Sequence, residues 1–284
     1  MSFCYTNKVF LFMKNKQMRK KIGLALGSGA WRGFAHIGVL KSLLKHEIEI
    51  DFLSGSSMGA LIAAYYAIFQ DIDKLEKDFT INSREKMPLF FDFSFTGGFI
   101  GGNKFAKYLD KIFLKYQFKD SLIPLQIIAT DLLSGQPFVF SEGDIAQAVR
   151  ASISVPLVFK PVKYKDKLLI DGGLSSPVPG DLLKKMGADL IIGVNVYHEN
   201  EFIKRKFTMP KVVMRSTRIV LHNLASNAIK SKDIDIVIEP DLSAFISTSG
   251  LSKYFTKEVI LKIIKAGEEA ADEKILEIKA LLNR

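Results

Sequence analysis

Apolar residues of this chain fall into short blocks, and most of these blocks are followed by longer segments with a helical spacing of apolar positions. This alternation predicts a three-layer α/β/α fold with a mainly parallel central sheet. Strands are expected at residues 21–26, 48–53, 125–130, 136–140, 188–196 and 235–239, with a hairpin at 160–170. Helices are expected around residues 35–43, at 60–69, 144–152 and 209–230, and from about 256 onward.

The alternating pattern begins near residue 19. It contains no internal repeat and no linker rich in Pro, Gly or Ser, so one domain over residues 19–284 is the simplest interpretation. Residues 1–18 do not fit the pattern and are expected to be a disordered tail or an overlong start. The apolar run at residues 9–13 is too short for a signal peptide or a membrane span. The single cysteine, Cys4, allows no internal disulfide.

Positive charge is in excess, with a net charge of +10 and a pI near 9.4. It concentrates at residues 14–21 and 204–222, which favours an anionic partner. No nucleic-acid-binding motif is recognisable, so we expect no nucleic-acid partner. One side of the helix at 209–230 is basic and the other apolar: Lys211, Arg215, Arg218 and His222 against Val213, Val220 and Leu224. This pattern is typical of a helix on an anionic membrane surface, or of a core helix with a solvated basic side.

A G-x-S-x-G pattern, from Gly55 to Gly59, lies between the second strand and its helix. In a strand-turn-helix setting this pattern is typical of a nucleophile elbow, where the turn strains the serine backbone and small neighbours leave room for it. The hydroxyl of Ser57 would then lie at a helix amino terminus, where the dipole favours negative charge. Ser57 is therefore the candidate nucleophile.

A glycine-rich loop from Gly27 to Gly33, with the sequence GSGAWRG, joins the first strand to its helix. Its backbone N–H groups can bind an anion, either the pyrophosphate of a nucleotide or the oxyanion of an acyl-transfer intermediate. The third glycine of a dinucleotide-binding fingerprint falls one residue late, at Gly33. Because a nucleophile elbow follows one strand later, we favour the oxyanion hole.

A carboxylate, Asp171, directly follows the apolar residues 168–170 and precedes Gly172 and Gly173. At a buried strand end this residue is a candidate general base, with a pKa that burial should raise. The same three residues would also fit a plain Asp-Gly turn.

Three blocks, residues 28–33, 55–59 and 171–173, resemble the patatin-like phospholipase family in order and spacing. The flanking residues 35–40, 128–132, 151–156 and 177–179 are similar too, and the resemblance to the short bacterial members covers residues 21–196. The resemblance implies a Ser57–Asp171 dyad in which Asp171 accepts the serine proton. It also implies an oxyanion hole from backbone N–H groups of Gly29 and Ala30, and hydrolysis of acyl esters of phospholipids or related lipids.

The loop departs from the family's G-G-G-x-[RK]-G pattern at Ser28 and Ala30, which replace its first and third glycines. The N–H groups survive both changes, so the hole persists provided that Ala30 need not adopt a positive φ. Arg32 keeps the basic position and can orient the loop, meet a phosphate or lie on the surface. The remaining glycines of the three motifs are expected to support them: Gly27, Gly33, Gly55, Gly59, Gly172 and Gly173.

A dyad requires that no histidine takes part. His198 is the competitor, because it follows a buried strand and would complete the Ser-Asp-His order of an α/β-hydrolase. That fold places several strands before its elbow, whereas only two fit ahead of Ser57, so we favour the dyad. His36 and His222 fall on expected helices, and His46 lies near the carboxyl end of one, where a cation suits the helix dipole; none of the three needs a catalytic role.

Together these patterns predict a carboxylic ester hydrolase that forms an acyl-enzyme and uses no metal and no organic cofactor. The expected substrate is a phospholipid, a lysophospholipid or a glyceride. We expect a cytoplasmic protein with peripheral contact at an anionic inner membrane surface. The phenylalanine-rich run at residues 89–99 is expected to form a flap over an acyl chain or a core layer. The alternative hypotheses are a non-catalytic lipid-binding or regulatory relative and a nucleotide-binding protein.

Overall fold

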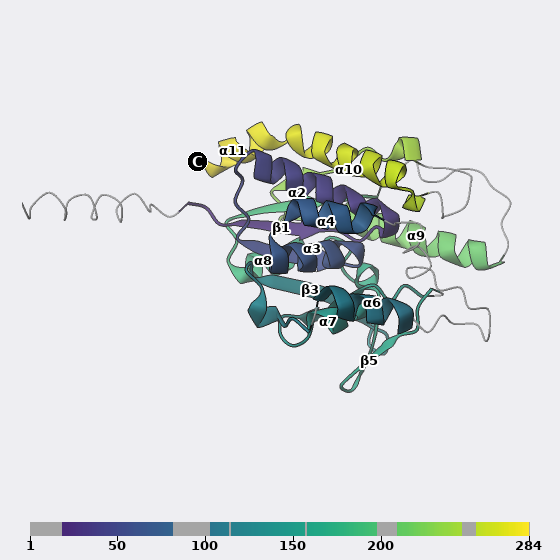
Figure 1. The fold of residues 1–284 in the computed structure, drawn as a ribbon. Coiled ribbons are helices and arrows are strands. Elements are labelled where there is room, and N and C mark those ends of the chain that lie inside the picture. Colours follow the sequence, from purple (N-terminus) through teal and green to yellow (C-terminus); the bar gives the residue numbers. More distant parts are fainter. Residues whose placement is uncertain are drawn as a thin grey trace, which may run out of the picture.

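A central sheet lies between two layers of helices in the computed structural model of the chain (Figure 1). The structure describes residues 19–81, 103–113, 115–156, 158–197, 209–245 and 254–283. The amino-terminal tail, the phenylalanine-rich run and His198 lie outside these ranges. The three-layer α/β/α fold that the sequence predicts is confirmed.

Eight strands form one mixed sheet in the order β5-β6-β3-β2-β1-β7-β8, with β4 paired to β3. In chain order they are β1 (Ile22–Leu26), β2 (Phe52–Ser56), β3 (Leu125–Asp131), β4 (Pro137–Phe140), β5 (Val162–Tyr164), β6 (Lys167–Ile170), β7 (Leu190–Val194) and β8 (Ile236–Ile238). The five strands from β3 to β8 along this order pair in parallel, whereas β4, β5 and β6 are antiparallel to their neighbours. Leu26 lies beside Gly55 on one side and Val194 on the other, so the carboxyl ends of β1, β2 and β7 meet at one edge.

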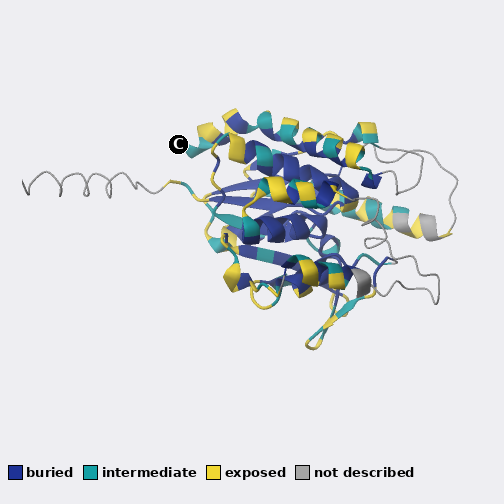
Figure 2. Ribbon diagram, viewed as in Figure 1, coloured by how far each residue is buried: buried dark blue, intermediate teal, exposed yellow. Residues whose placement is uncertain are grey.

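Helices cover both faces of the sheet. One face carries α2 (Ala35–Lys45), α3 (Met58–Phe69), α7 (Ile145–Ser152) and α10 (Lys257–Asp272), and the other carries α8 (Gly180–Met186) and α9 (Met209–Ala228). The side chains of β1 alternate between them, with Leu24 and Leu26 in the first core and Ala25 in the second. Buried strands accordingly lie between helices with exposed outer sides (Figure 2). The other elements are η1 (Ala30–Phe34), α4 (Ile72–Thr80), α6 (Asn103–Phe113), η2 (Phe118–Asp120), η3 (Gly172–Leu174), η5 (Ser243–Phe245) and α11 (Ile275–Leu282).

Helices α2 and α10 pack unusually closely along what we call the α2–α10 seam. A Cβ atom on Gly38 would lie 1.8 Å from the carbonyl oxygen of Ile264, and one on Gly267 would lie 2.0 Å from that of Ala35. Only glycine permits this approach of the two backbones. The carboxy-terminal helix is thereby fixed to the helix that follows the glycine-rich loop.

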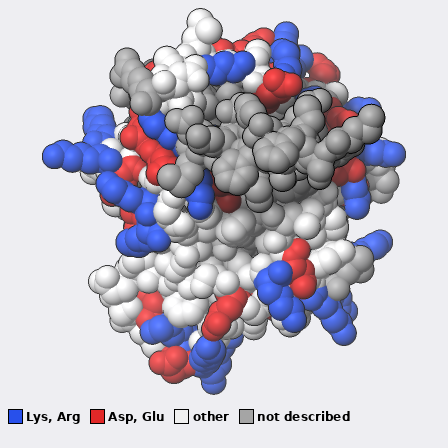
Figure 3. Space-filling view, turned by 90° about the vertical axis from the view of Figure 1, so that its left-hand side faces the viewer, with Lys and Arg blue, Asp and Glu red and all other residues white. Residues whose placement is uncertain are grey.

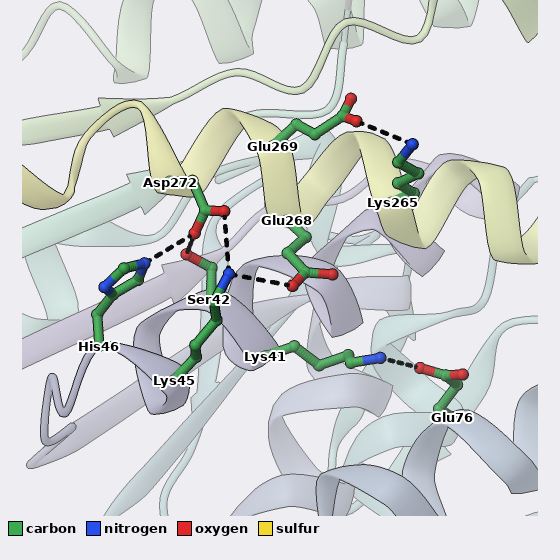
Figure 4. Close-up of polar contacts among 9 residues, drawn as sticks. All are labelled: Lys41, Ser42, Lys45, His46, Glu76, Lys265, Glu268, Glu269 and Asp272. Carbon is green, nitrogen blue, oxygen red and sulfur yellow. Dashed lines mark hydrogen bonds and ion pairs between the residues drawn. The ribbon is translucent and has the colours of Figure 1, made fainter.

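Polar contacts tie the same seam together at one end (Figure 4). The Asp272 carboxylate accepts a hydrogen bond from Ser42 Oγ at 2.5 Å and lies 3.1 Å from His46 Nε2 and 3.5 Å from Lys45 Nζ. All three partners belong to α2 or its carboxyl-terminal cap. Asp272 therefore joins the last turn of α10 to the last turn of α2.

The second strand starts later than the sequence analysis expected. It runs over Phe52–Ser56 rather than residues 48–53. Ile48 and Ile50 lie in the preceding loop, although their own side chains are buried in the core. Apolar side chains in a buried loop give the same local pattern as a strand. As a result β2 leads directly into the predicted elbow.

Charge is well mixed on the side of the molecule shown in Figure 3, where blue and red side chains are interspersed. The basic excess therefore does not form a single patch on that side. Among the described helices, none combines the length and the apolar character needed to cross a membrane.

Candidate active site

Ser57 forms the turn between β2 and α3 and is buried. Its backbone adopts φ 53° and ψ −121°, which a non-glycine residue occupies at a cost of roughly 1–3 kcal/mol. The N–H group of Ser57 donates to Ser152 Oγ at 2.8 Å, and this bond holds the turn. The sequence predicted a strained serine at this position, and the backbone geometry confirms the strain.

Asp171 lies directly against this serine. Ser57 Oγ donates a hydrogen bond to Asp171 Oδ2 at 2.6 Å, and the N–H group of Gly173 donates to Oδ1 at 2.8 Å. The carboxylate is only 4% exposed, and this burial raises its pKa to about 6, although both hydrogen bonds act in the opposite direction. Asp171 is thus mostly ionised at neutral pH and accepts a proton more readily than an exposed carboxylate.

The segment from Ser152 to Ser154 supports both members of the pair. Ser152 Oγ accepts from the N–H group of Ser57, and the Ser154 carbonyl accepts from the N–H group of Asp171 at 3.0 Å. Ser154 Oγ in turn accepts from the buried guanidinium of Arg150 at 2.7 Å. In the sequence, residues 151–156 resemble the family only as a flanking segment, and no role was predicted for these serines. The only sequence signal for this supporting role was the presence of two serines at the end of a buried helix.

Some backbone N–H groups of the glycine-rich loop have no acceptor within the described part of the chain. Those of Gly27, Ser28 and Arg32 donate to backbone carbonyls. Those of Gly29 and Ala30 find no acceptor within the described part of the chain, and both residues line the cavity that holds the serine–aspartate pair. A cavity wall with two unused donors beside a hydroxyl can stabilise negative charge there.

Ala30 does adopt a positive φ, of 49°. The prediction of an oxyanion hole from sequence required that Ala30 need not adopt a positive φ, and this condition is not met. Alanine here occupies a left-handed conformation at a cost of roughly 1 kcal/mol. The N–H group remains available in that conformation. Glycine, which the family pattern has here, would adopt it without this cost.

His36 supports the glycine-rich loop through a hydrogen bond to its first residue. Its Nε2–H donates to the Gly27 carbonyl at 2.7 Å, and complete burial lowers the pKa of the ring to about 4, so His36 is neutral near pH 7. It does not line the cavity. Its role in the structure is thus to fix the loop, which agrees with the non-catalytic interpretation from sequence.

Arg32 is only 6% exposed, which excludes the surface position that was one of its three expected roles. Its guanidinium lies 4.4 Å from the ring centre of Trp31. Trp31 stacks in turn on Tyr254, with ring centres 4.0 Å apart. The loop is therefore connected to the segment that precedes α10.

The supporting glycines serve close packing rather than positive φ angles. At each of them a Cβ atom would lie less than 3.0 Å from a neighbouring atom. The nearest approaches are 2.1 Å, from Gly59 to the Leu26 carbonyl oxygen and from Gly172 to the Ile128 carbonyl oxygen. The same holds for Gly27, Gly29, Gly33, Gly55 and Gly173. These glycines bring the three motifs together around Ser57.

The serine–aspartate pair opens into a mostly apolar cavity of about 130 Å³. Residues that the sequence analysis assigned to no site complete its walls: Val155, Val158, Phe159, Tyr197, Leu221 and Phe255. Helix α9 contributes Thr217, Arg218 and Leu221 to this wall. An apolar cavity beside a serine–aspartate pair suits an acyl chain.

The two sides of α9 are not arranged as expected. Arg218, a member of the expected basic side, lines the cavity, whereas Val213 and Val220 are 45% and 50% exposed. The helix is therefore not a core helix with its apolar side buried. The side chain of Lys211 lies outside the described residues.

Fold and site together define an α/β protein with a serine–aspartate pair in an apolar cavity. The sequence model of the patatin-like phospholipase family matches residues 24–184, which is more than half of the chain. The chain therefore belongs to the patatin-like phospholipase family.

Individual relatives agree with this assignment. An uncharacterized NTE family protein of Mycobacterium tuberculosis is 32% identical over 176 residues, covering 62% of this chain and 49% of the relative. A lysophospholipase, nte1, of Aspergillus fumigatus is 30% identical over 181 residues, covering 62% of this chain and 12% of the relative. The chain thus spans about half the length of the mycobacterial relative and far less of the fungal one.

Among solved structures, VipD from Legionella pneumophila has a similar fold. The TM-score is 0.54 at 16% sequence identity, covering 91% of this chain and 67% of VipD. This likeness concerns the fold alone.

Proposed function

We propose that this protein is a serine acyl hydrolase that cleaves carboxylic esters of lipids through Ser57 and Asp171. The hydrogen bond of 2.6 Å between Ser57 Oγ and Asp171 Oδ2, inside an apolar cavity, is the observation that carries the proposal. A nucleophile in contact with a base is the arrangement that covalent catalysis requires. Membership of the patatin-like phospholipase family supports the lipid ester as the reacting group.

In the first half of the reaction, Ser57 Oγ attacks the acyl carbonyl carbon while Asp171 takes the hydroxyl proton. Negative charge develops on the carbonyl oxygen, where the N–H groups of Gly29 and Ala30 act as hydrogen-bond donors. The tetrahedral intermediate then collapses, the acyl group stays on Ser57, and the leaving alcohol takes the proton from Asp171.

In the second half, water attacks the acyl-enzyme and Asp171 accepts a water proton. The same N–H groups stabilise the second oxyanion, and collapse releases the fatty acid and returns the proton to Ser57 Oγ. A pKa of about 6 suits both halves, because Asp171 is ionised at neutral pH and still basic enough to take a proton in the transition state.

The apolar cavity favours a lipid substrate, and the similarity to the fungal lysophospholipase supports the same substrate class. Helix α9 lines the cavity and also carries exposed apolar residues, Val213 and Val220 among them. This helix is our candidate for peripheral contact with an anionic membrane, together with Arg215 on the same helix.

A nucleotide-binding function of the glycine-rich loop has less support. The N–H groups of Gly27 and Ser28 already donate to the Val194 and Pro177 carbonyls at 3.1 and 2.8 Å. A pyrophosphate cradle needs several free donors in succession. The N–H groups of Gly29 and Ala30, which line the cavity beside Ser57, are better placed for one oxyanion. Intact Ser57 and Asp171, in contact, also argue against a non-catalytic relative.

A fluorophosphonate probe tests the proposal directly. We expect covalent labelling of Ser57, located by peptide mass spectrometry, and loss of labelling and of ester turnover in Ser57→Ala. The neighbouring buried Ser56 provides a matched control, because Ser56→Ala removes a hydroxyl one residue away and should keep the label. Labelling that persists in Ser57→Ala, or that maps to Ser54 or Ser56, would contradict the assignment.

A further inference from the structure

We propose that Arg218 on α9 recognises a phosphate group of the substrate and so sets a preference for phosphate-bearing acyl esters over neutral ones. This inference rests on the function proposed above. The observation behind it is that Arg218 lines the same cavity as Ser57 and Asp171, although it belongs to the opposite helical layer. A cation in that wall faces the substrate rather than only the solvent.

The charged residues that line the cavity favour the binding of an anion. Among its described lining residues there are two guanidinium groups, Arg32 and Arg218, and one carboxylate, Asp171. Asp171 is occupied by the Ser57 hydroxyl and the Gly173 N–H group. Near neutral pH these three lining residues together carry a net positive charge in mostly apolar surroundings, where a bound anion gains more than it would in water.

The two arginines differ in their availability. Arg32 is buried and stacked on Trp31, so its position is set by the loop. Arg218 is half-buried, and in the described ranges no carboxylate pairs with it. A guanidinium group matches two phosphate oxygens at once through paired N–H donors. A phosphate diester is thus the lipid component that Arg218 fits best, whereas a neutral glyceride offers it only weak acceptors.

The helix geometry separates this role from membrane contact. Thr217, Arg218 and Leu221 point to the cavity within one turn of α9, and Val213 and Val220 are exposed on other sides of the helix. Arg215 lies one turn before Arg218 and does not line the cavity. Arg215→Gln is therefore a matched control for Arg218→Gln, since both remove one positive charge from the same helix.

The first experiment compares two soluble substrates that have the same short acyl chain, a lysophosphatidylcholine and a monoacylglycerol, both below micelle-forming concentrations. In the parent, kcat/KM should be higher for the lysophosphatidylcholine. Arg218→Gln should lower the ratio of the two kcat/KM values about tenfold or more, as expected for a lost charge-assisted hydrogen bond. Arg218→Lys should recover part of the ratio, because it restores the charge without the paired donors.

Arg215→Gln should leave this ratio unchanged. An equal fall of kcat/KM for both substrates in Arg218→Gln, or an equal change of the ratio in Arg215→Gln, would overturn the assignment. A parent that hydrolyses neither ester contradicts the proposed function instead, and the inference is then decided by binding.

Binding can be followed without turnover because Trp31 is the single tryptophan of the chain and lines the cavity. Ser57→Ala protein is titrated with an ether-linked lysophosphatidylcholine, with the matching monoalkylglycerol and with inorganic phosphate. We expect the ether-linked lysophosphatidylcholine to bind about tenfold or more tightly than the monoalkylglycerol, and this difference should vanish when Arg218→Gln is added. Equal binding of the two lipids, or equally tight binding of inorganic phosphate, would contradict recognition of a lipid phosphate.

Discussion

Two carboxylates in two regions of this molecule show opposite physical signatures. Asp171 is buried at the strand end beside Ser57, and burial raises its pKa to about 6. Asp272 lies at the α2–α10 seam with its side chain 37% exposed, and the hydrogen bond from Ser42, followed by Lys45 and His46, lowers its pKa (Figure 4). Burial thus disfavours the ionised form of Asp171, whereas the hydrogen-bond and charged partners of Asp272 favour its ionised form.

This difference separates a candidate catalytic group from a structural one. The charge of Asp272 stabilises the seam, as expected of an ion pair retained for stability. The charge of Asp171 lowers the stability of the fold, and its partners in the described residues, the Ser57 hydroxyl and the Gly173 N–H group, carry no positive charge. A buried, uncompensated carboxylate beside a nucleophile is typical of a site where function outweighs stability.

The largest expected difference between the two regions is in turnover. Asp171→Asn keeps the shape of the side chain but removes the base, so kcat for a soluble ester should fall by about 10²–10⁴-fold. Asp272→Asn should leave kcat within about twofold, since this residue contacts the carboxyl-terminal end of α2, whereas the glycine-rich loop precedes the amino-terminal end. Circular dichroism of both variants checks that they are folded. Comparable losses of kcat in the two folded variants would remove the distinction.

Stability should change in the opposite direction at Asp171. Its folded pKa of about 6 exceeds the value of about 3.9 for an unfolded chain, so the free energy of unfolding decreases as the pH rises from about 4 to about 6. Asparagine carries no charge, so Asp171→Asn should be more stable than the parent by roughly 1–3 kcal/mol at pH 8. The gain should disappear below about pH 4. Urea unfolding at pH 4 and pH 8 measures both values, and lower stability of the variant at pH 8 would contradict the burial argument.

Asp272→Asn should show the reverse pH dependence on a smaller scale. The pKa of Asp272 in the folded protein is below its value in the unfolded chain. The ionised carboxylate therefore stabilises the fold above about pH 4, and this stabilisation is lost as the pH falls through the folded pKa. Because the Asp272 side chain is more than a third exposed, Asp272→Asn should lower the free energy of unfolding at pH 7 by only about 0.5–1 kcal/mol. Ser42→Ala removes the main partner and should give a loss of similar size in the same assay. A stabilising effect of either variant at pH 7 would be inconsistent with this role.

The smallest expected effect concerns the strained loop. Ala30→Gly restores the glycine of the family pattern at a φ of 49°. Relief of the left-handed strain should exceed the entropic cost of glycine and raise the free energy of unfolding by up to about 0.5 kcal/mol. Gly135, also at positive φ and without close neighbours, provides the converse control, because Gly135→Ala should lower stability. A loss of stability in Ala30→Gly would argue against the strain.

Much of the fold could be predicted from the sequence because its signals are local. The elbow and the glycine-rich loop follow the parallel strands β2 and β1, whose carboxyl ends share one edge of the sheet. The Asp171 motif follows the antiparallel strand β6, whose last residue, Ile170, lies beside Thr130 near the carboxyl end of β3. The position of β2 was predicted wrongly, since a buried loop with Ile48 and Ile50 imitates a strand.

The supporting contacts could not be predicted, because they join residues far apart in the sequence. Ser152 lies 95 positions from Ser57, and no local pattern marks its hydrogen bond. Arg218 and Phe255 enter the cavity from elements beyond the residues that resemble the family. The chemistry was thus visible in local motifs, whereas the wall that faces the substrate depends on tertiary packing.

The central claim, that Asp171 alone serves as base for Ser57, is tested most directly by the pH dependence of Ser57 phosphonylation. The second-order rate constant for a fluorophosphonate should rise with pH to a plateau, with an apparent pKa of about 6, in the parent and in His198→Ala. In folded Asp171→Asn the inflection should be absent and labelling slower by about 10²–10⁴-fold. An inflection that persists in Asp171→Asn and disappears in His198→Ala would contradict the dyad.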